Sequence, residues 1–181
     1  MSGIDYANAQ VTKTDLRRIE TLIPVTGLGS WLSAIKNTDQ SVTTVETNLT
    51  WSATYNVPDV GNRWALAGSG FRYTGSKSPA NFLVQLSVNL RKIGNNSNNA
   101  VRINVNGSMY QLASITTLVD RASDSHNVIL QRIVSMNTND VLTIGMQNDT
   151  GNTDCGLRAQ TTVGGQTGNH AALSIVEIIS Q

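Results

Sequence analysis

The sequence is short of charged, aromatic and cysteine residues. Charged residues make up only 14% of the 181 positions, aromatic residues 5%, and the formal net charge is +1. The longest basic runs are the pairs Arg17-Arg18 and Arg91-Lys92. These are too few to form the concentrated basic face that displaces counterions from nucleic acid. We therefore expect no nucleic-acid partner.

Two kinds of hydrophobic segment are also missing. No run of about eighteen or more apolar residues occurs, so no membrane-spanning helix and no membrane insertion are expected. The first ten residues lack the basic and apolar regions that make up a secretory signal peptide. These two absences predict synthesis in the cytoplasm.

Cys155 is the only cysteine, which excludes an intrachain disulfide and a cysteine-based zinc site. A catalytic pair could be built from Cys155 with His126 or His170, or a triad from Asp124, Ser125 and His126. However, Cys155 has no activating neighbour in the sequence, and adjacent loop residues seldom converge as a triad. We interpret Cys155 as a small buried hydrophobe and His170 as an exposed residue that begins a strand. The chain is predicted not to be an enzyme.

No cofactor is expected either, because the sequence has no glycine-rich phosphate loop and no paired-carboxylate pattern. Asp149 and Asp154, with Asn152 between them, are the best candidates for oxygen ligands to calcium. Their spacing lacks the regular alternation and the bidentate glutamate of an EF-hand loop. We therefore interpret them as part of a solvated turn and predict no bound metal.

The missing charge is replaced by Asn, Ser, Thr, Gly and Gln, including 19 asparagines. Asn, Ser and Thr compete with helical hydrogen bonds, whereas Thr fits a pleated surface. The composition therefore favours strands and turns over helices.

Alternation of apolar and polar residues predicts the individual strands. Residues 81–92 alternate strictly, and Asn106-Gly107 between two apolar runs is the strongest short hairpin signal. Residues 171–179 are apolar on both faces, which predicts a central strand whose second face is covered by a neighbouring subunit. Further strands are expected at residues 64–73 (with a bulge or close contact at 68–70), 101–105, 109–115, 128–136, 141–146 and 156–163, and a solvated loop at 94–99. About eight strands in two antiparallel sheets form an all-β jelly-roll sandwich.

The N-terminal third differs from the rest. Residues 1–60 are predicted to be an anchor region, in which Leu16, Ile19 and Ile23 recur at helical spacing. An apolar extended stretch that includes Trp31 follows, and residues 41–51 alternate like a first strand. We predict that Leu16, Ile19, Ile23 and Trp31 contact other subunits or a larger particle. Residues 61–181 are predicted to form the jelly-roll domain.

Four stretches of the sequence carry a resemblance to one known family. They are GFRYTG followed by NFLVQLSVNL, VRINVNGSMY, ILQRIVSMNTNDVLTIGM and HAALSIVEIIS. In order and pattern they resemble the C1q and tumour-necrosis-factor-like jelly roll, including the versions found in phage and viral head-decoration and fibre proteins. The resemblance implies a homotrimer whose subunits pack sheet to sheet around a three-fold axis.

The function that this resemblance implies is that of a virion structural protein. It would decorate a capsid as a trimer, cap a head fibre or form a binding knob, and its location would be the virion. Its expected partners are further copies of itself, other capsid or virion proteins, and a host-surface glycan or receptor. Two alternatives are a small single-jelly-roll capsid protein and a carbohydrate-binding module that uses Trp31, Trp51 or Trp64.

Overall fold

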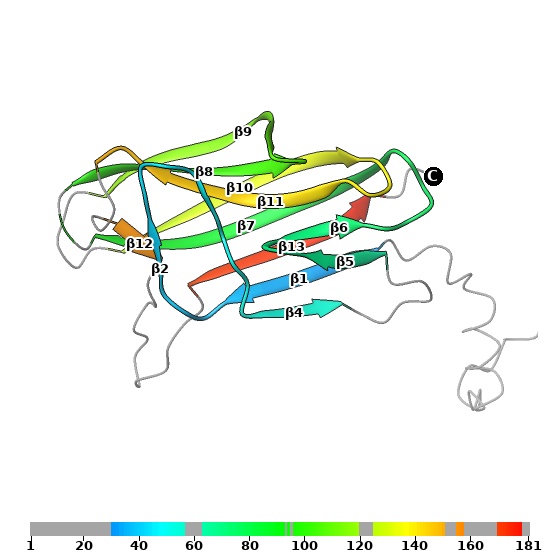
Figure 1. Cartoon of the computed structure of the whole chain (residues 1–181), viewed down its shortest axis with the longest axis horizontal. Coiled ribbons are helices and arrows are strands. Elements are labelled where there is room, and N and C mark those ends of the chain that lie inside the picture. The colour runs from blue at the N-terminus through cyan, green and yellow to red at the C-terminus, as the bar shows by residue number, and fades with distance from the viewer. Residues whose placement is uncertain are drawn as a thin grey trace, which may run out of the picture.

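The computed structural model describes residues 30–56, 63–92, 94, 96–119, 125–150, 155–157 and 170–178. Within them, strands form two antiparallel sheets that pack face to face, one of seven strands and one of six (Figure 1). None of the described residues forms a helix that is long and apolar enough to cross a membrane. The predicted all-β jelly-roll sandwich is confirmed.

The seven-stranded sheet is built around its longest strand. Its strands are β1 (Trp31–Lys36), β2 (Gln40–Val42), β4 (Ala53–Asn56), β7 (Ala80–Lys92), β10 (Ser125–Met136), β12 (Cys155–Leu157) and β13 (Ala171–Ile178). β7 pairs with β10 along one edge, and with β13 and then β12 along the other. From β13 the sheet continues to β1 and β4, and from β12 to β2.

The six-stranded sheet runs in the order β5-β6-β11-β8-β9, with β3 also paired to β11. Its strands are β3 (Thr47–Asn48), β5 (Trp64–Ala67), β6 (Gly70–Tyr73), β8 (Ser97–Val105), β9 (Ser108–Val119) and β11 (Val141–Asn148). β11 pairs with β8 along one edge, and with the short strands β3 and β6 along the other.

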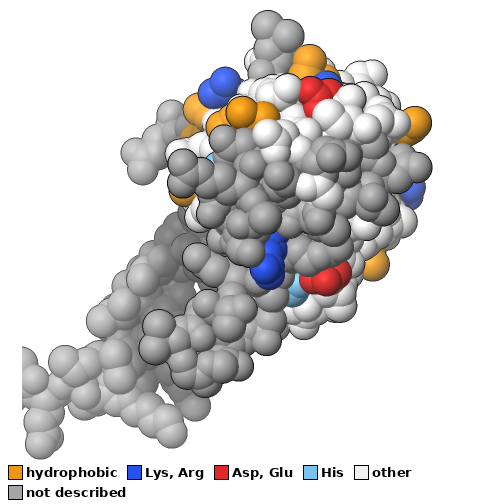
Figure 2. Space-filling model, turned by 90° about the vertical axis from the view of Figure 1, so that its left-hand side faces the viewer, with side chains coloured by type: hydrophobic (Ala, Val, Ile, Leu, Met, Phe, Trp, Pro, Cys, Tyr) orange, Lys and Arg blue, Asp and Glu red, His pale blue; other side chains and the backbone are white. Residues whose placement is uncertain are grey.

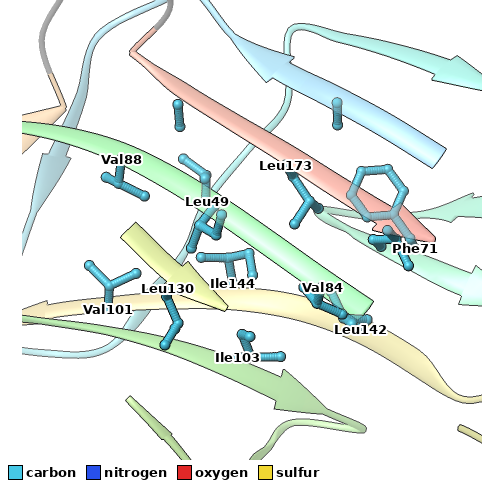
Figure 3. Close-up of a cluster of buried hydrophobic side chains, with 14 of the residues drawn as sticks. Leu49, Phe71, Val84, Val88, Val101, Ile103, Leu130, Leu142, Ile144 and Leu173 are labelled. Atoms are coloured by element: carbon cyan, nitrogen blue, oxygen red, sulfur yellow. The ribbon is translucent and has the colours of Figure 1, made fainter. Parts of the chain in front are cut away.

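The hydrophobic core lies between the two sheets. In β7 every second residue from Phe82 to Leu90 is buried, as the strict alternation predicted. Figure 3 shows side chains from both sheets, such as Val84 and Leu173 from one and Leu142 and Ile144 from the other, filling the space between the layers. Each fully buried side chain of this kind contributes roughly 1.5–3 kcal/mol. This packing holds the two sheets together.

Two local predictions are confirmed, the Asn106-Gly107 hairpin and the central position of the last strand. Asn106 and Gly107 have φ angles of 52° and 79°, the positive values that a type I′ turn requires, and they join β8 to β9. A second turn, with Asn139 at φ 76°, joins β10 to β11. β13 is central, because it lies between β7 and β1.

Two local predictions need correction. The bulge suggested at residues 68–70 is instead a hairpin turn between β5 and β6, because Ala67 pairs with Gly70 and Gly68 has a φ of 61°. The alternative of a close contact is confirmed at Gly70, which lies against Thr143 and the Leu142 carbonyl. The prediction of a solvated loop at 94–99 is wrong for its last residues, 97–99, which belong to β8. Ser97 and Asn99 are each only 1% exposed there, and the Asn99 amide donates to the Ser97 carbonyl at 3.0 Å. β8 thus begins inside the expected loop.

More strands form than the eight predicted, because the edges of both sheets are completed by strands of two to four residues. Several of these lie before residue 60: β1 and β4 pair within the seven-stranded sheet, and β3 pairs within the six-stranded one. The division into an anchor of residues 1–60 and a domain of residues 61–181 stays a prediction.

Two glycine substitutions separate backbone strain from steric exclusion. A Cβ at Gly107 would meet no atom within 4 Å, so Gly107→Ala should cost only the strain of its positive φ, about 1 kcal/mol. A Cβ at Gly70 would lie 2.5 Å from Thr143 Cγ2 and 2.6 Å from the Leu142 carbonyl oxygen. Gly70→Ala should therefore cost at least about 2 kcal/mol. Urea unfolding at equal protein concentration measures both, and equal costs would contradict this packing.

Candidate functional site

The outer face of the seven-stranded sheet carries a continuous row of apolar side chains. Strand register places Trp31 of β1 opposite Val176 of β13, Val176 opposite Leu83 of β7, and Leu83 opposite Ile133 of β10. Trp31 is 37% exposed, Val176 40% and Ile133 59%. The row therefore crosses four strands and remains open to solvent within one chain.

Two further rows run parallel to the first. The next row is polar and consists of Ser33, Ser174, Gln85 and Gln131. The third is mostly apolar and consists of Ile35, Ala172, Ser87 and Ile129, the last of which is 65% exposed. A hollow of about 330 Å³ lies over the second and third rows. None of these residues is charged, so the face is an uncharged surface with apolar side chains on both sides of a polar centre.

Charge is placed differently on the two outer faces of the sandwich, and on the seven-stranded sheet Arg91 of β7 lies beyond the third row. The outer face of the six-stranded sheet carries Arg72, Arg102 and Glu46, whereas the three rows on the seven-stranded sheet carry none. Among the described residues that Figure 2 colours at one end of the sandwich, the hydrophobic side chains are scattered between charged and other polar ones. An extended uncharged face with exposed Ile and Trp is typical of a surface that another protein covers.

A buried carboxylate fixes the edge of this face at Trp31. The Glu177 side chain is 2% exposed, and its Oε2 accepts hydrogen bonds from the Ser30 backbone N–H at 3.0 Å and from Arg63 Nη1 at 2.8 Å. The Glu177 N–H donates in turn to the Ser30 carbonyl at 2.7 Å. These bonds hold the start of β1 against β13, which keeps Trp31 in register with Val176.

Of the four residues predicted to make subunit or particle contacts, Trp31 lies on this face. Leu16, Ile19 and Ile23 lie outside the described residues. Sequence reasoning did not single out Leu83, Ile129 and Ile133. The available signal was that each is an apolar residue on the otherwise polar face of an alternating strand.

The other tryptophans are not free to stack on a sugar. Trp64 is 2% exposed and packs edge-on against Phe82, with ring centroids 4.9 Å apart. Trp51 is partly buried, and its ring centroid lies 5.8 Å from that of Phe71. Trp31 alone of the three suggested tryptophans lies on an outer sheet face.

The candidate metal ligands are only partly described. The Asp149 carboxylate accepts hydrogen bonds from Asn98, at 2.8 Å from the backbone N–H and 2.5 Å from Nδ2. These bonds lower the pKa of Asp149 below its usual value. Asp154 lies outside the described residues. Among the residues that are described, no group of three or more His, Cys, Asp and Glu is placed to hold a metal ion.

Of the residues in the enzymatic interpretations, Cys155 and His126 lie apart, and Asp124 lies outside the described residues. Cys155 is buried in β12, and β12 and β10, which carries His126, flank β7 on opposite edges. Adjacent strands are about 4.8 Å apart, and Cys155 pairs with Lys92 whereas His126 pairs with Leu90, so the two backbones are separated by more than about 10 Å. The expectation of an exposed His170 is wrong: it is 3% exposed, and its Nε2 lies 2.8 Å from Asp39 Oδ1.

The buried phenol beside the Glu177 carboxylate predicts a loss of stability at alkaline pH. Burial, and then the charge of Glu177, raise the pKa of Tyr73 above 10.0 in the folded chain. Stability from the neutral phenol is therefore present below pH 10 and is lost as the pH rises through the folded pKa. Urea unfolding at about pH 8 and about pH 11 should show a smaller loss for Tyr73→Phe than for the native chain. An equal loss in both proteins would contradict this assignment.

Comparison with known proteins gives similarity of structure only. No family model and no curated protein matches the sequence. The crystal structure of murine APRIL at pH 8.0 superposes with a TM-score of 0.53 at 13% identity, covering 83% of this chain and 99% of that chain. The structure of murine APRIL at pH 5.0 gives 0.51 at 11% identity, with the same coverage. The PRD1 vertex protein P5 gives 0.47 at 15% identity, covering 84% and 99%. The chain therefore has the fold of the tumour-necrosis-factor and C1q-like jelly rolls.

Proposed function

We propose that this chain is a virion structural protein that assembles as a homotrimer through the outer face of the seven-stranded sheet. The observation that carries the trimer is the set of three uncharged rows across β1, β13, β7 and β10, with Trp31, Ile129 and Ile133 exposed. The virion role rests on the sequence resemblance to the jelly rolls of phage and viral head and fibre proteins. By this proposal the protein decorates a capsid or caps a fibre.

The arrangement of the rows supports a ring of subunits. A trimer with three-fold symmetry needs two different patches on each subunit, one for each neighbour. The largest exposed groups stand at the two sides of the face, with Ile129 and Ile133 on β10 and Trp31 on β1. Between these two sides the three rows cross β13 and β7, and the hollow lies there over the second and third rows. The β10 side of one subunit can therefore pack on the β1 and β13 side of the next.

We also propose that the chain acts by binding and not by catalysis. Two observations support this: the Cys155 thiol is buried, and the backbone of Cys155 lies about two strand spacings from His126. The remaining partners are proposed to be other capsid or virion proteins, which Leu16, Ile19 and Ile23 would contact, and a glycan or receptor on the host surface.

The solution mass of the full-length protein tests the trimer. Light scattering after size exclusion should give about three times the 19.4 kDa of one chain, or about 58 kDa. A stable monomer would contradict the proposal, because the three rows would then face solvent. A megadalton particle would favour the alternative in which the chain closes a capsid shell by itself.

A matched pair of substitutions tests which face associates. Ile133 is 59% exposed in the apolar row, and Leu66 is 66% exposed on β5 of the other sheet. Ile133→Asp would bury an unpaired carboxylate in the proposed contact, so we expect a shift from trimer to monomer at about 10 µM protein. Leu66→Asp makes the same chemical change elsewhere and should leave the trimer intact. A trimer that survives Ile133→Asp would place the contact on another surface.

A further inference from the structure

A shallow hollow of about 260 Å³ lies on the opposite side of the sandwich, on the outer face of the six-stranded sheet. It is formed where β9, β8 and β11 lie side by side, and it is lined by Asn98, Ala100, Arg102, Thr116, Gln147 and Asp149 among others. The lining is polar except for Ala100. Because the hollow faces away from the proposed trimer contact, it stays accessible in the assembled protein.

Ala100 explains why the surface is hollow at this point. It pairs with Thr116 of β9 on one side and with Gln147 of β11 on the other. The three side chains therefore point to the same face of the sheet, since directly opposed residues share a face. The methyl group of Ala100 is much shorter than its neighbours, so it forms a low point between them.

One wall of the hollow is held in place by hydrogen bonds. Arg102 Nη1 donates to Glu46 Oε2 at 2.6 Å and to Gln147 Oε1 at 2.9 Å. Gln147 Nε2 donates to the Thr44 carbonyl at 2.8 Å. These bonds use one guanidinium nitrogen and leave Nη2 of Arg102 without a hydrogen bond to any described residue. Nη2 of Arg102 is therefore a hydrogen-bond donor that this wall holds in a fixed position.

The position of Glu46 depends on Gly145, which lies next to Arg102 in the sheet register. A Cβ at Gly145 would collide with the Glu46 carboxylate, so the glycine leaves the space that this carboxylate occupies beside Arg102. Glu46 Oε1 also accepts a hydrogen bond from Asn104 Nδ2 at 2.5 Å. Arg102 is thus held by a loop that is itself anchored.

The opposite wall presents acceptors. Asn98 donates to both oxygens of Asp149 and orients this carboxylate at the rim. Each carboxylate oxygen can accept a further hydrogen bond, because each has two lone pairs. The Thr116 hydroxyl makes no hydrogen bond to another residue in the described part of the chain. The hollow therefore offers donors, acceptors and a hydroxyl group around a small apolar floor.

We propose that this hollow is a binding site for one neutral sugar unit of a glycan. Sugar hydroxyls both donate and accept, so they match a lining of guanidinium, carboxylate, amide and hydroxyl groups. The charges favour a neutral ligand, because Arg102 is already paired with Glu46 and Asp149 adds a second negative charge. The site rests on the part of the proposed function that names a host-surface glycan as a partner, and it does not depend on the trimer.

The test is a titration of the full-length protein with simple glycosides, followed by saturation-transfer NMR of the ligand. The probes are the methyl glycosides of glucose, galactose, mannose, fucose, N-acetylglucosamine and N-acetylgalactosamine, with a methyl sialoside as the anionic comparison. Ala100→Leu fills the floor and should abolish the signal. Thr116→Val removes one hydroxyl at nearly constant volume and should weaken binding roughly fivefold. Ser114→Val is the matched control, since Ser114 is two residues away on the same face and does not line the hollow.

The expected result is saturation transfer to at least one neutral glycoside, which Ala100→Leu and Thr116→Val reduce and Ser114→Val does not. Thermal unfolding of each variant at equal concentration checks that the fold is intact. The proposal is overturned if none of the neutral glycosides gives a signal at tens of millimolar, or if only the sialoside does. It is also overturned if a neutral signal survives in the folded Ala100→Leu protein, or is lost equally in Ser114→Val. None of these outcomes depends on the oligomeric state.

Discussion

Pairing of β7 along both of its edges is the constraint on which the rest of the structure depends. Ala80 to Arg91 pair with β10 on one side, and the opposite edge pairs with β13 and then β12. The alternation of apolar and polar residues in β7 then determines which face of the sheet is buried. Every second residue from Phe82 to Leu90 enters the core, and Leu83, Gln85 and Ser87 point outward. A slip of one residue would exchange the two sets and lose the core, so the register is strongly fixed.

The fixed register gives the two outer faces different chemistry. On the seven-stranded sheet it aligns uncharged side chains from four strands into rows, a surface that resembles half of a protein interface. On the six-stranded sheet it places Ala100 between Thr116 and Gln147, where a short side chain leaves a polar hollow. Because the two faces are on opposite layers, association on one does not cover the other.

Features carried by neighbouring residues could be predicted from the sequence. The strand at 81–92, the Asn106-Gly107 hairpin and the central position of 171–178 all follow from patterns within about a dozen residues. Features that need residues far apart could not be predicted. The row that joins Trp31 to Ile133 depends on three strand pairings, and Glu46 reaches Arg102 across 56 positions. The burial of His170 depends likewise on partners such as Lys36 and Asp39. The pattern of one segment does not encode such contacts.

The low content of charge is consistent with this division of the surface. The ion pairs of the described residues join segments that are distant in sequence: Arg63 with Glu177, and Arg102 with Glu46. The Arg102–Glu46 pair is partly exposed and contributes at most about 1 kcal/mol, so its main effect is to position what it holds. Arg63 pairs with the buried Glu177 carboxylate, which would be left buried and unpaired without it. Arg63 and Glu177 fix the start of β1 and with it Trp31, whereas Arg102 and Glu46 fix one wall of the hollow. Charge is thus placed where it orients a surface, and it is left out of the rows, where burial in the proposed trimer would leave it unpaired.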